Sequence, residues 1–270
     1  MRFLLSLLLA ASPLTAASVE GIKIHSTIAG KGPKTVILVH GWTCDETTWN
    51  MQIPALTKDY RMVTLDLPGH GQSGSPKDGK FSMDLFARAV EAVRREAKAD
   101  RVVLVGHSMG TPVVIQYERL FPQHTAALVF VDGAVTISND GSFKPPDPNQ
   151  MKGPGGQKAR EAMIRSMFSG ATTPEMQQHI LRMMLSAPES TAAGAMQAAF
   201  DPAAWKDDVI TVPVLGIYAD NSRMANREYS KTHFPNMELV EIPGTGHFLM
   251  MEKADEFNRL LLAFLAKQKF

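Results

Sequence analysis

The chain has 270 residues, of which 44% are hydrophobic and 20% charged, and its formal net charge at pH 7 is +1. This composition excludes a disordered or fibrous protein, and the length suits one large α/β domain with a buried core. The lysines and arginines are scattered along the chain and form no basic stripe of the kind that a nucleic-acid-binding protein needs. The one cysteine, Cys44, excludes a disulfide within the chain but not one between two chains.

The first 18 residues have the pattern of a secretory signal peptide. Arg2 gives a positive start, and Phe3 to Ala11 is an apolar run too short to span a bilayer. Small residues follow from Thr15 to Ser18, so we expect cleavage near Ala17 or Ser18 and export to the periplasm or out of the cell. No later apolar run reaches transmembrane length, so the mature protein is expected to have no stable membrane insertion.

Short apolar runs then alternate with amphipathic segments. An edge strand is expected from Gly21 to Ile28, and a last strand from Met237 to Ile242. Between them, five runs lack polar alternation, as strands buried on both faces must: Thr35–Val39, Met62–Leu65, Val102–Val105, Ala127–Val131 and Val212–Tyr218. Apolar residues at helical spacing predict helices over Met83–Ala97, Pro112–Phe121 and Glu252–Lys267. This alternation predicts an α/β fold with a mostly parallel sheet flanked by helices.

Residues 137–205 interrupt the alternation with a loop rich in proline and glycine, followed by helical segments rich in methionine. We interpret this stretch as a helical cap over the functional site. The α/β core would then comprise residues 19–136 and 206–270. The methionines of the cap suit either a flexible lining for hydrophobic ligands or a small core of the cap itself.

Gly106-His107-Ser108-Met109-Gly110 matches the pattern G-x-S-x-G, between a predicted strand and a predicted helix. The flanking glycines allow a sharp, strained turn that exposes the Ser108 hydroxyl. A hydroxyl is a weak nucleophile until a base takes its proton. Ser108 is therefore the candidate nucleophile.

His247 is the candidate base, because it follows the last predicted strand in a glycine-rich loop at the edge of the sheet where such sites gather. Its position after the serine in the chain is also the expected order. The other seven histidines have local explanations or are expected to be solvated: His25, His40, His70, His107, His124, His179 and His233.

Four motifs in this order resemble the α/β-hydrolase fold family. They are His40-Gly41-Trp42, residues 66–73 (DLPGHGQS), Gly106–Gly110 and Gly246-His247-Phe248. The resemblance runs from about residue 20 to the C-terminus and leaves only the cap unmatched. It implies the α/β-hydrolase fold with the cap inserted after the family's sixth strand, and an oxyanion hole formed by the backbone amides of Trp42 and Met109.

The resemblance leaves two positions open for the acid that orients His247. Family members most often place it after the seventh strand, where this chain has Asp220 but carries Ser222 at the matching position. Some relatives, haloalkane dehalogenases among them, place it after the sixth strand, where Asp132 stands. We favour Asp132 and keep Asp220 as the alternative.

The resemblance further implies a serine hydrolase that cleaves carboxylic esters or lactones of hydrophobic small molecules through an acyl-enzyme. It implies no metal and no organic cofactor. Hydrolysis of carbon–carbon bonds and cofactor-free perhydrolysis use the same three residues and stay open as alternatives. A receptor-like binding protein that retains the fold is a further alternative. The sequence says nothing about the oligomeric state.

Overall fold

The computed structural model describes residues 16–137, 146–220, 222 and 224–270. One seven-stranded sheet has the strand order β3-β5-β4-β6-β7-β8-β9, in which β3 pairs antiparallel with β5 and the other neighbours are parallel. Two short strands, β1 (Ser18–Val19) and β2 (Ile22–Lys23), form a separate pair. The strands of the sheet are β3 (Ser26–Ala29), β4 (Thr35–Val39), β5 (Arg61–Leu65), β6 (Val102–His107), β7 (Thr125–Val131), β8 (Val214–Ala219) and β9 (Met237–Ile242).

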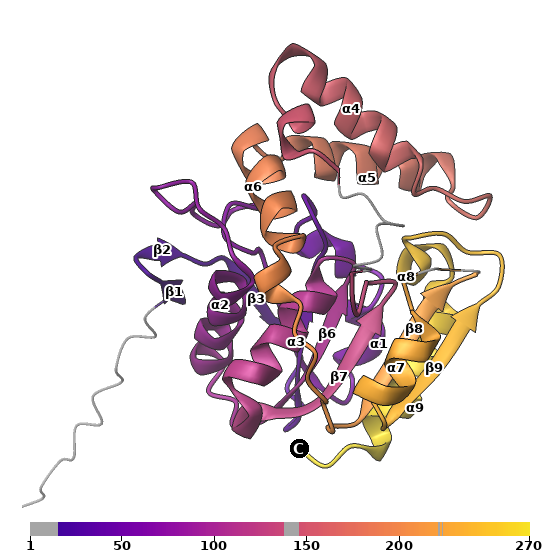
Figure 1. Cartoon of the computed structure of the whole chain (residues 1–270). Helices are drawn as coiled ribbons and strands as arrows, with labels where there is room; N and C mark the ends of the chain where they lie inside the picture. Colours follow the sequence, from indigo (N-terminus) through magenta and orange to yellow (C-terminus); the bar gives the residue numbers. More distant parts are fainter. Residues whose placement is uncertain (1–15, 138–145, 221, 223) are drawn as a thin grey trace, which may run out of the picture.

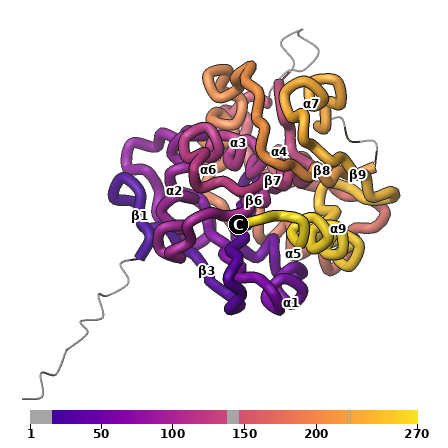
Figure 2. Tube along the Cα trace, turned by 90° about the horizontal axis from the view of Figure 1, so that it is seen from below, coloured from indigo at the N-terminus to yellow at the C-terminus, as the bar shows by residue number. Residues whose placement is uncertain are grey.

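Helices cover both faces of this sheet (Figures 1 and 2). Helices α2 (Met83–Glu96) and α3 (Gly110–Leu120) lie on one face, and α1 (Ile53–Leu56) and α9 (Ala254–Lys267) on the other. The remaining core helices are η1 (Glu46–Trp49), η2 (Pro122–His124), α7 (Arg227–His233) and α8 (Leu249–Glu252). The layered α/β arrangement confirms the predicted fold class.

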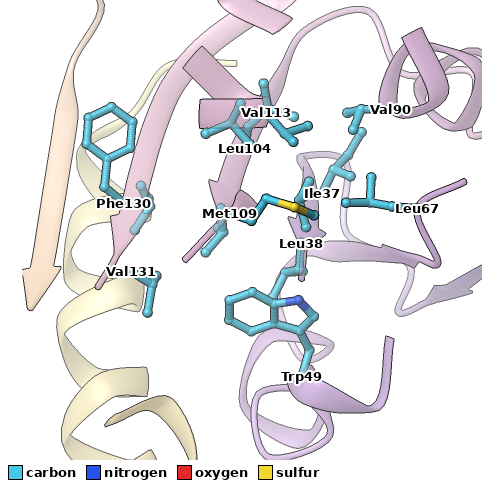
Figure 3. Close-up of a cluster of buried hydrophobic side chains, with 14 of the residues drawn as sticks. Ile37, Leu38, Trp49, Leu67, Val90, Leu104, Met109, Val113, Phe130 and Val131 are labelled. Atoms are coloured by element: carbon cyan, nitrogen blue, oxygen red, sulfur yellow. The ribbon is translucent and has the colours of Figure 1, made fainter. Parts of the chain in front are cut away.

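The central strands are buried along their whole length, which is why they lack polar alternation. Every residue of β4, β6 and β7 is buried. Figure 3 shows how Ile37 and Leu104, from adjacent strands, meet Val90 of α2 and Val113 of α3 in one apolar cluster. This packing fixes the carboxyl ends of the strands, where the candidate residues lie.

Most predicted boundaries differ from the observed ones by one or two residues, and three of the differences have a visible structural cause. The single edge strand expected from Gly21 to Ile28 is divided into β2, which pairs with β1, and β3, which pairs with β5; between them Ile24 N donates to the carbonyl of Ala17 (2.9 Å). Strand β8 begins after Pro213, because proline has no N–H to donate to a sheet. The last helix, expected over Glu252–Lys267, begins at Ala254 as α9, because Lys253 has a non-helical φ of −131° and ψ of 59°, and Glu252 ends the separate short helix α8.

The cap helices lie together over the carboxyl end of the sheet (Figure 1). Residues 138–145, at the start of the predicted cap, lie outside the described residues. The methionines of the cap are found in both expected places: Met163 and Met196 line the cavity described below, whereas Met184 is 2% exposed and lies in the hydrophobic core. The helical elements of the cap are η3 (Pro148–Met151), α4 (Gly153–Arg165), α5 (Pro174–Ser186), α6 (Glu189–Ala199) and η4 (Pro202–Ala204).

Residues 1–15 of the predicted signal peptide, which spans residues 1–18, lie outside the described residues. Ala17 is buried and Ser18 begins β1. In the part of the chain that is described, no helix combines the length and the hydropathy that crossing a bilayer requires.

Candidate active site

Ser108 lies in the tight turn between β6 and α3 with a φ of 53°. This left-handed conformation costs a residue with a side chain about 1 to 3 kcal/mol. Two backbone hydrogen bonds hold it in place: Ser108 N donates to the carbonyl of Val131, and Thr111 N donates to the carbonyl of Ser108, both at 2.9 Å. The turn therefore has the strained strand-to-helix geometry that the motif predicts.

Gly106 and Gly110 make this turn possible. A Cβ atom on Gly106 would lie 2.3 Å from the carbonyl oxygen of Gly110, and one on Gly110 would lie 2.4 Å from the carbonyl oxygen of Val39. Both neighbours are backbone atoms, which cannot give way without displacing α3 or β4. Steric crowding by backbone atoms thus requires glycine at both positions of the motif.

His247 and Asp132 form a buried pair at the same edge of the sheet. His247 Nδ1 donates to Asp132 Oδ2 at 2.6 Å, and the two residues are 8% and 4% exposed. Ala219 N, at the end of β8, donates to the other carboxylate oxygen of Asp132 at 3.1 Å. The ends of parallel strands therefore bring together an imidazole and a carboxylate that are 115 residues apart in the chain.

Several groups keep the Asp132 carboxyl ionised. Burial alone would raise its pKa, but hydrogen bonds from His247, Ser222 and Ala219 N hold the pKa below its usual value. An ionised Asp132 keeps the proton of a neutral His247 on Nδ1. Nε2 is then left as the acceptor that a general base requires.

Of the two candidate acids, the structure brings Asp132 to His247. Asp220 is exposed, and its Oδ2 accepts a hydrogen bond from Gly244 N at 3.3 Å. Ser222, at the position that matches the more common acid of the family, hydrogen-bonds to Asp132 instead.

His107, the residue before the serine, fixes the loop of His247. Its Nε2 donates to the carbonyl oxygen of His247 at 2.8 Å, and the two rings lie 4.7 Å apart between centroids. Burial lowers the pKa of His107 to about 3, so this imidazole is neutral at physiological pH. The turn that carries Ser108 and the loop that carries His247 are thereby joined directly.

Trp42 and Met109, the predicted oxyanion-hole residues, line the same cavity as Ser108. The Met109 side chain points into the apolar core (Figure 3). The Trp42 indole donates from Nε1 to the carbonyl of Ala192 in α6 at 2.8 Å, so the cap anchors it. Packing thus fixes both residues beside the serine.

Ser108, Asp132 and His247 face one cavity of about 570 Å³, a volume that suits a small-molecule ligand. Most of the other lining is apolar and comes from the cap and from the loops at the sheet edge: Met163, Met167, Phe168, Met196, Ala199, Phe200, Trp205 and Met224. Within the described ranges, no three His, Cys, Asp or Glu side chains are grouped so as to bind a metal ion. The cavity therefore combines Ser108, Asp132 and His247 with a mostly apolar wall whose methionines can adapt in shape.

A family model described as "Alpha/beta hydrolase family" matches residues 36–260. The chain belongs to the alpha/beta hydrolase family. The matched range includes all four motifs on which the resemblance was based, and the match confirms that resemblance.

Individual relatives of this α/β hydrolase are distant. It is 26% identical over 258 residues to the dihydrolipoyllysine-residue acetyltransferase component of an acetoin cleaving system from Pseudomonas putida, covering 89% of this chain but only 65% of that protein. An esterase from Thermogutta terrifontis has a TM-score of 0.79 at 24% identity, with 94% and 97% of the two chains covered. An enol-lactonase from Burkholderia xenovorans LB400 has a TM-score of 0.80 at 21% identity, with 94% and 100% covered. These structures share the fold of this hydrolase.

Proposed function

We propose that this α/β hydrolase cleaves carboxylic esters or lactones of hydrophobic small molecules through an acyl-enzyme on Ser108. The observation that carries the proposal is the 2.6 Å pairing of Asp132 with His247 in the cavity that a strained serine also faces. In the first step His247 Nε2 takes the proton of Ser108 Oγ, which attacks the carbonyl carbon of the substrate. Asp132 stabilises the imidazolium that forms.

The attack places negative charge on the former carbonyl oxygen. The backbone N–H groups of Trp42 and Met109 would receive that oxyanion, and one such donor is worth about 3 to 4 kcal/mol of transition-state stabilisation. When the intermediate collapses, His247 gives its proton to the departing alkoxide. Water, deprotonated by His247, then attacks the acyl-serine; as this second intermediate collapses, His247 returns the proton to Ser108 Oγ and the acid is released.

The thiol of Cys44 does not suit the role of nucleophile. It is 2% exposed, and burial raises the pKa of its thiol to about 12. A neutral thiol is a poor nucleophile. The proposal therefore rests on Ser108.

The cavity wall supports a hydrophobic acyl or alcohol group in the substrate. With p-nitrophenyl esters from acetate to octanoate, kcat/KM should rise by up to about fourfold for each methylene that enters the cavity, because burying a methylene is worth about 0.8 kcal/mol. A parallel series of lactones of increasing ring and side-chain size would show whether cyclic esters follow the same trend. The measurement is release of p-nitrophenol or acid, with Ser108→Ala as the background.

Two results would contradict this proposal. Ligand-induced thermal stabilisation without turnover of any ester or lactone would indicate a binding protein of this fold. Turnover confined to carbon–carbon bonds of diketones, or to formation of peracids, would assign the site to another reaction.

A further inference from the structure

The loop that carries His247 packs backbone to backbone against the cap. We call residues 166–173, which connect α4 to α5, the cap turn. His247 N donates to the carbonyl of Met167 in this turn at 3.2 Å. A Cβ atom on Gly246 would lie 2.9 Å from that same carbonyl oxygen and 2.9 Å from the Cβ of Ser169. Glycine before the histidine is therefore needed for the cap turn to reach the base.

The carboxylate of Glu252 joins the same two segments. Glu252 Oε2 accepts a hydrogen bond from Gly246 N at 2.5 Å, and Oε1 accepts one from the hydroxyl of Thr172. The Thr172 hydroxyl in turn accepts a hydrogen bond from Ser169 N at 2.8 Å. A continuous chain of hydrogen bonds thus runs from the cap turn through Thr172 and Glu252 to the residue before His247.

Glu252 is well placed to hold both segments, because it is the last residue of the short helix α8, which is packed into the core. Leu249 and Met250, in the same helix α8, are fully buried. The side chain of Gln52 also donates to the carbonyl of Met250 at 2.8 Å. Thr172 is 3% exposed, so water competes little for its hydroxyl. Hydrogen bonds to an ionised carboxylate in such surroundings are stronger than those between neutral groups.

We propose that Glu252 and Thr172 are positioning residues, which set the location of His247 by locking its loop to the cap turn. The inference rests on the proposed function, since it assigns a role relative to His247 as the base. Asp132 orients the imidazole ring, whereas Glu252 and the carbonyl of Met167 fix the backbone from which the ring extends. A misplacement of a reacting group by about 1 Å can lower a rate about 100-fold. The cap therefore contributes to catalysis as well as forming a wall of the cavity.

Thr172→Val tests this role, because valine keeps the shape of threonine and removes the hydroxyl. We expect kcat for a p-nitrophenyl ester to fall about tenfold or more as His247 moves away from its productive position, with KM changed less than about threefold. Thr172→Ser retains the hydroxyl and should restore kcat to within about threefold of wild type.

Thr173→Val is the matched control. Its hydroxyl accepts a hydrogen bond from Met176 N and caps α5, so its loss weakens the neighbouring helix without removing the bridge to Glu252. This variant should keep kcat near the wild-type value. All rates are to be measured at a temperature at which circular dichroism shows each variant to be fully folded.

A wild-type kcat in Thr172→Val, or equal losses of kcat in Thr172→Val and Thr173→Val, would overturn the positioning role. Failure of Thr172→Ser to restore activity would also overturn it. These failures are distinguishable from failure of the proposed function, in which the wild-type protein itself turns over no ester or lactone.

Discussion

Replacing Ser108 by alanine should lower kcat for ester hydrolysis about 10⁶-fold, the effect that loss of a nucleophilic serine has in hydrolases with a Ser-His-Asp triad. Alanine retains Cβ but has no oxygen to attack the carbonyl carbon. The turn should survive, because the backbone hydrogen bonds to Val131 and Thr111 do not use the serine side chain. Initial rates with the best p-nitrophenyl ester, corrected for spontaneous hydrolysis, provide the measurement.

Cys44→Ala is the matched control for this variant. It removes the buried thiol of the protein's one cysteine and should leave kcat within a small factor of wild type. If Ser108→Ala kept substantial activity while Cys44→Ala lost it, the nucleophile would be misassigned.

Replacing Asp132 by asparagine should lower kcat about 10⁴-fold. The amide of asparagine can donate to His247 Nδ1, which favours the tautomer with the proton on Nε2 and so leaves no acceptor for the proton of Ser108. The size and shape of the side chain stay nearly the same, so the effect on folding should be smaller than the effect on turnover. Steady-state kinetics and thermal unfolding of the variant separate the two.

Asp220→Asn supplies the comparison, because Asp220 is exposed at the rim of the same cavity. It should change kcat by less than about threefold, as expected of a residue that does not orient the base. The reverse order of effects would make Asp220 the acid and would contradict the geometry at His247.

Much of the fold follows from local patterns in the sequence. Short runs of valine and leucine such as Val102–Val105 favour strands that are covered on both faces. Gly106 and Gly110 mark a turn in which a side chain would collide with the backbone of the neighbouring elements. The serine and the histidine could be proposed for the same reason. Each follows a predicted strand of the parallel sheet, and the carboxyl ends of such strands meet at one edge.

The sequence favoured Asp132 as the acid but could not exclude Asp220. Asp132 and Asp220 both follow strands that end at this edge, and which one reaches His247 depends on the paths of the loops after β7 and β8. The structure shows that Asp132, with a φ of 41°, meets the imidazole, and that Ser222 adds a further hydrogen bond to its carboxylate. Neither feature has a signal in the order of the residues.

The contacts between cap and base were also missed by sequence reasoning. Glu252 was expected only as the start of a helix, and Thr172 carried no signal beyond its place in the cap. Their interaction joins residues 80 positions apart, and the carbonyl of Met167 is a backbone group that any residue would supply. Contacts of this kind depend on how the cap docks onto the core.

The most direct test of Ser108 as the nucleophile is to trap its acyl intermediate. The wild-type enzyme would be mixed with a p-nitrophenyl ester, quenched with acid during the first turnovers, digested and examined by mass spectrometry. We predict that the peptide containing Ser108 gains the mass of the acyl group, and that Ser108→Ala shows no such gain. An acyl group on a different residue of the turning-over enzyme would contradict the mechanism proposed here.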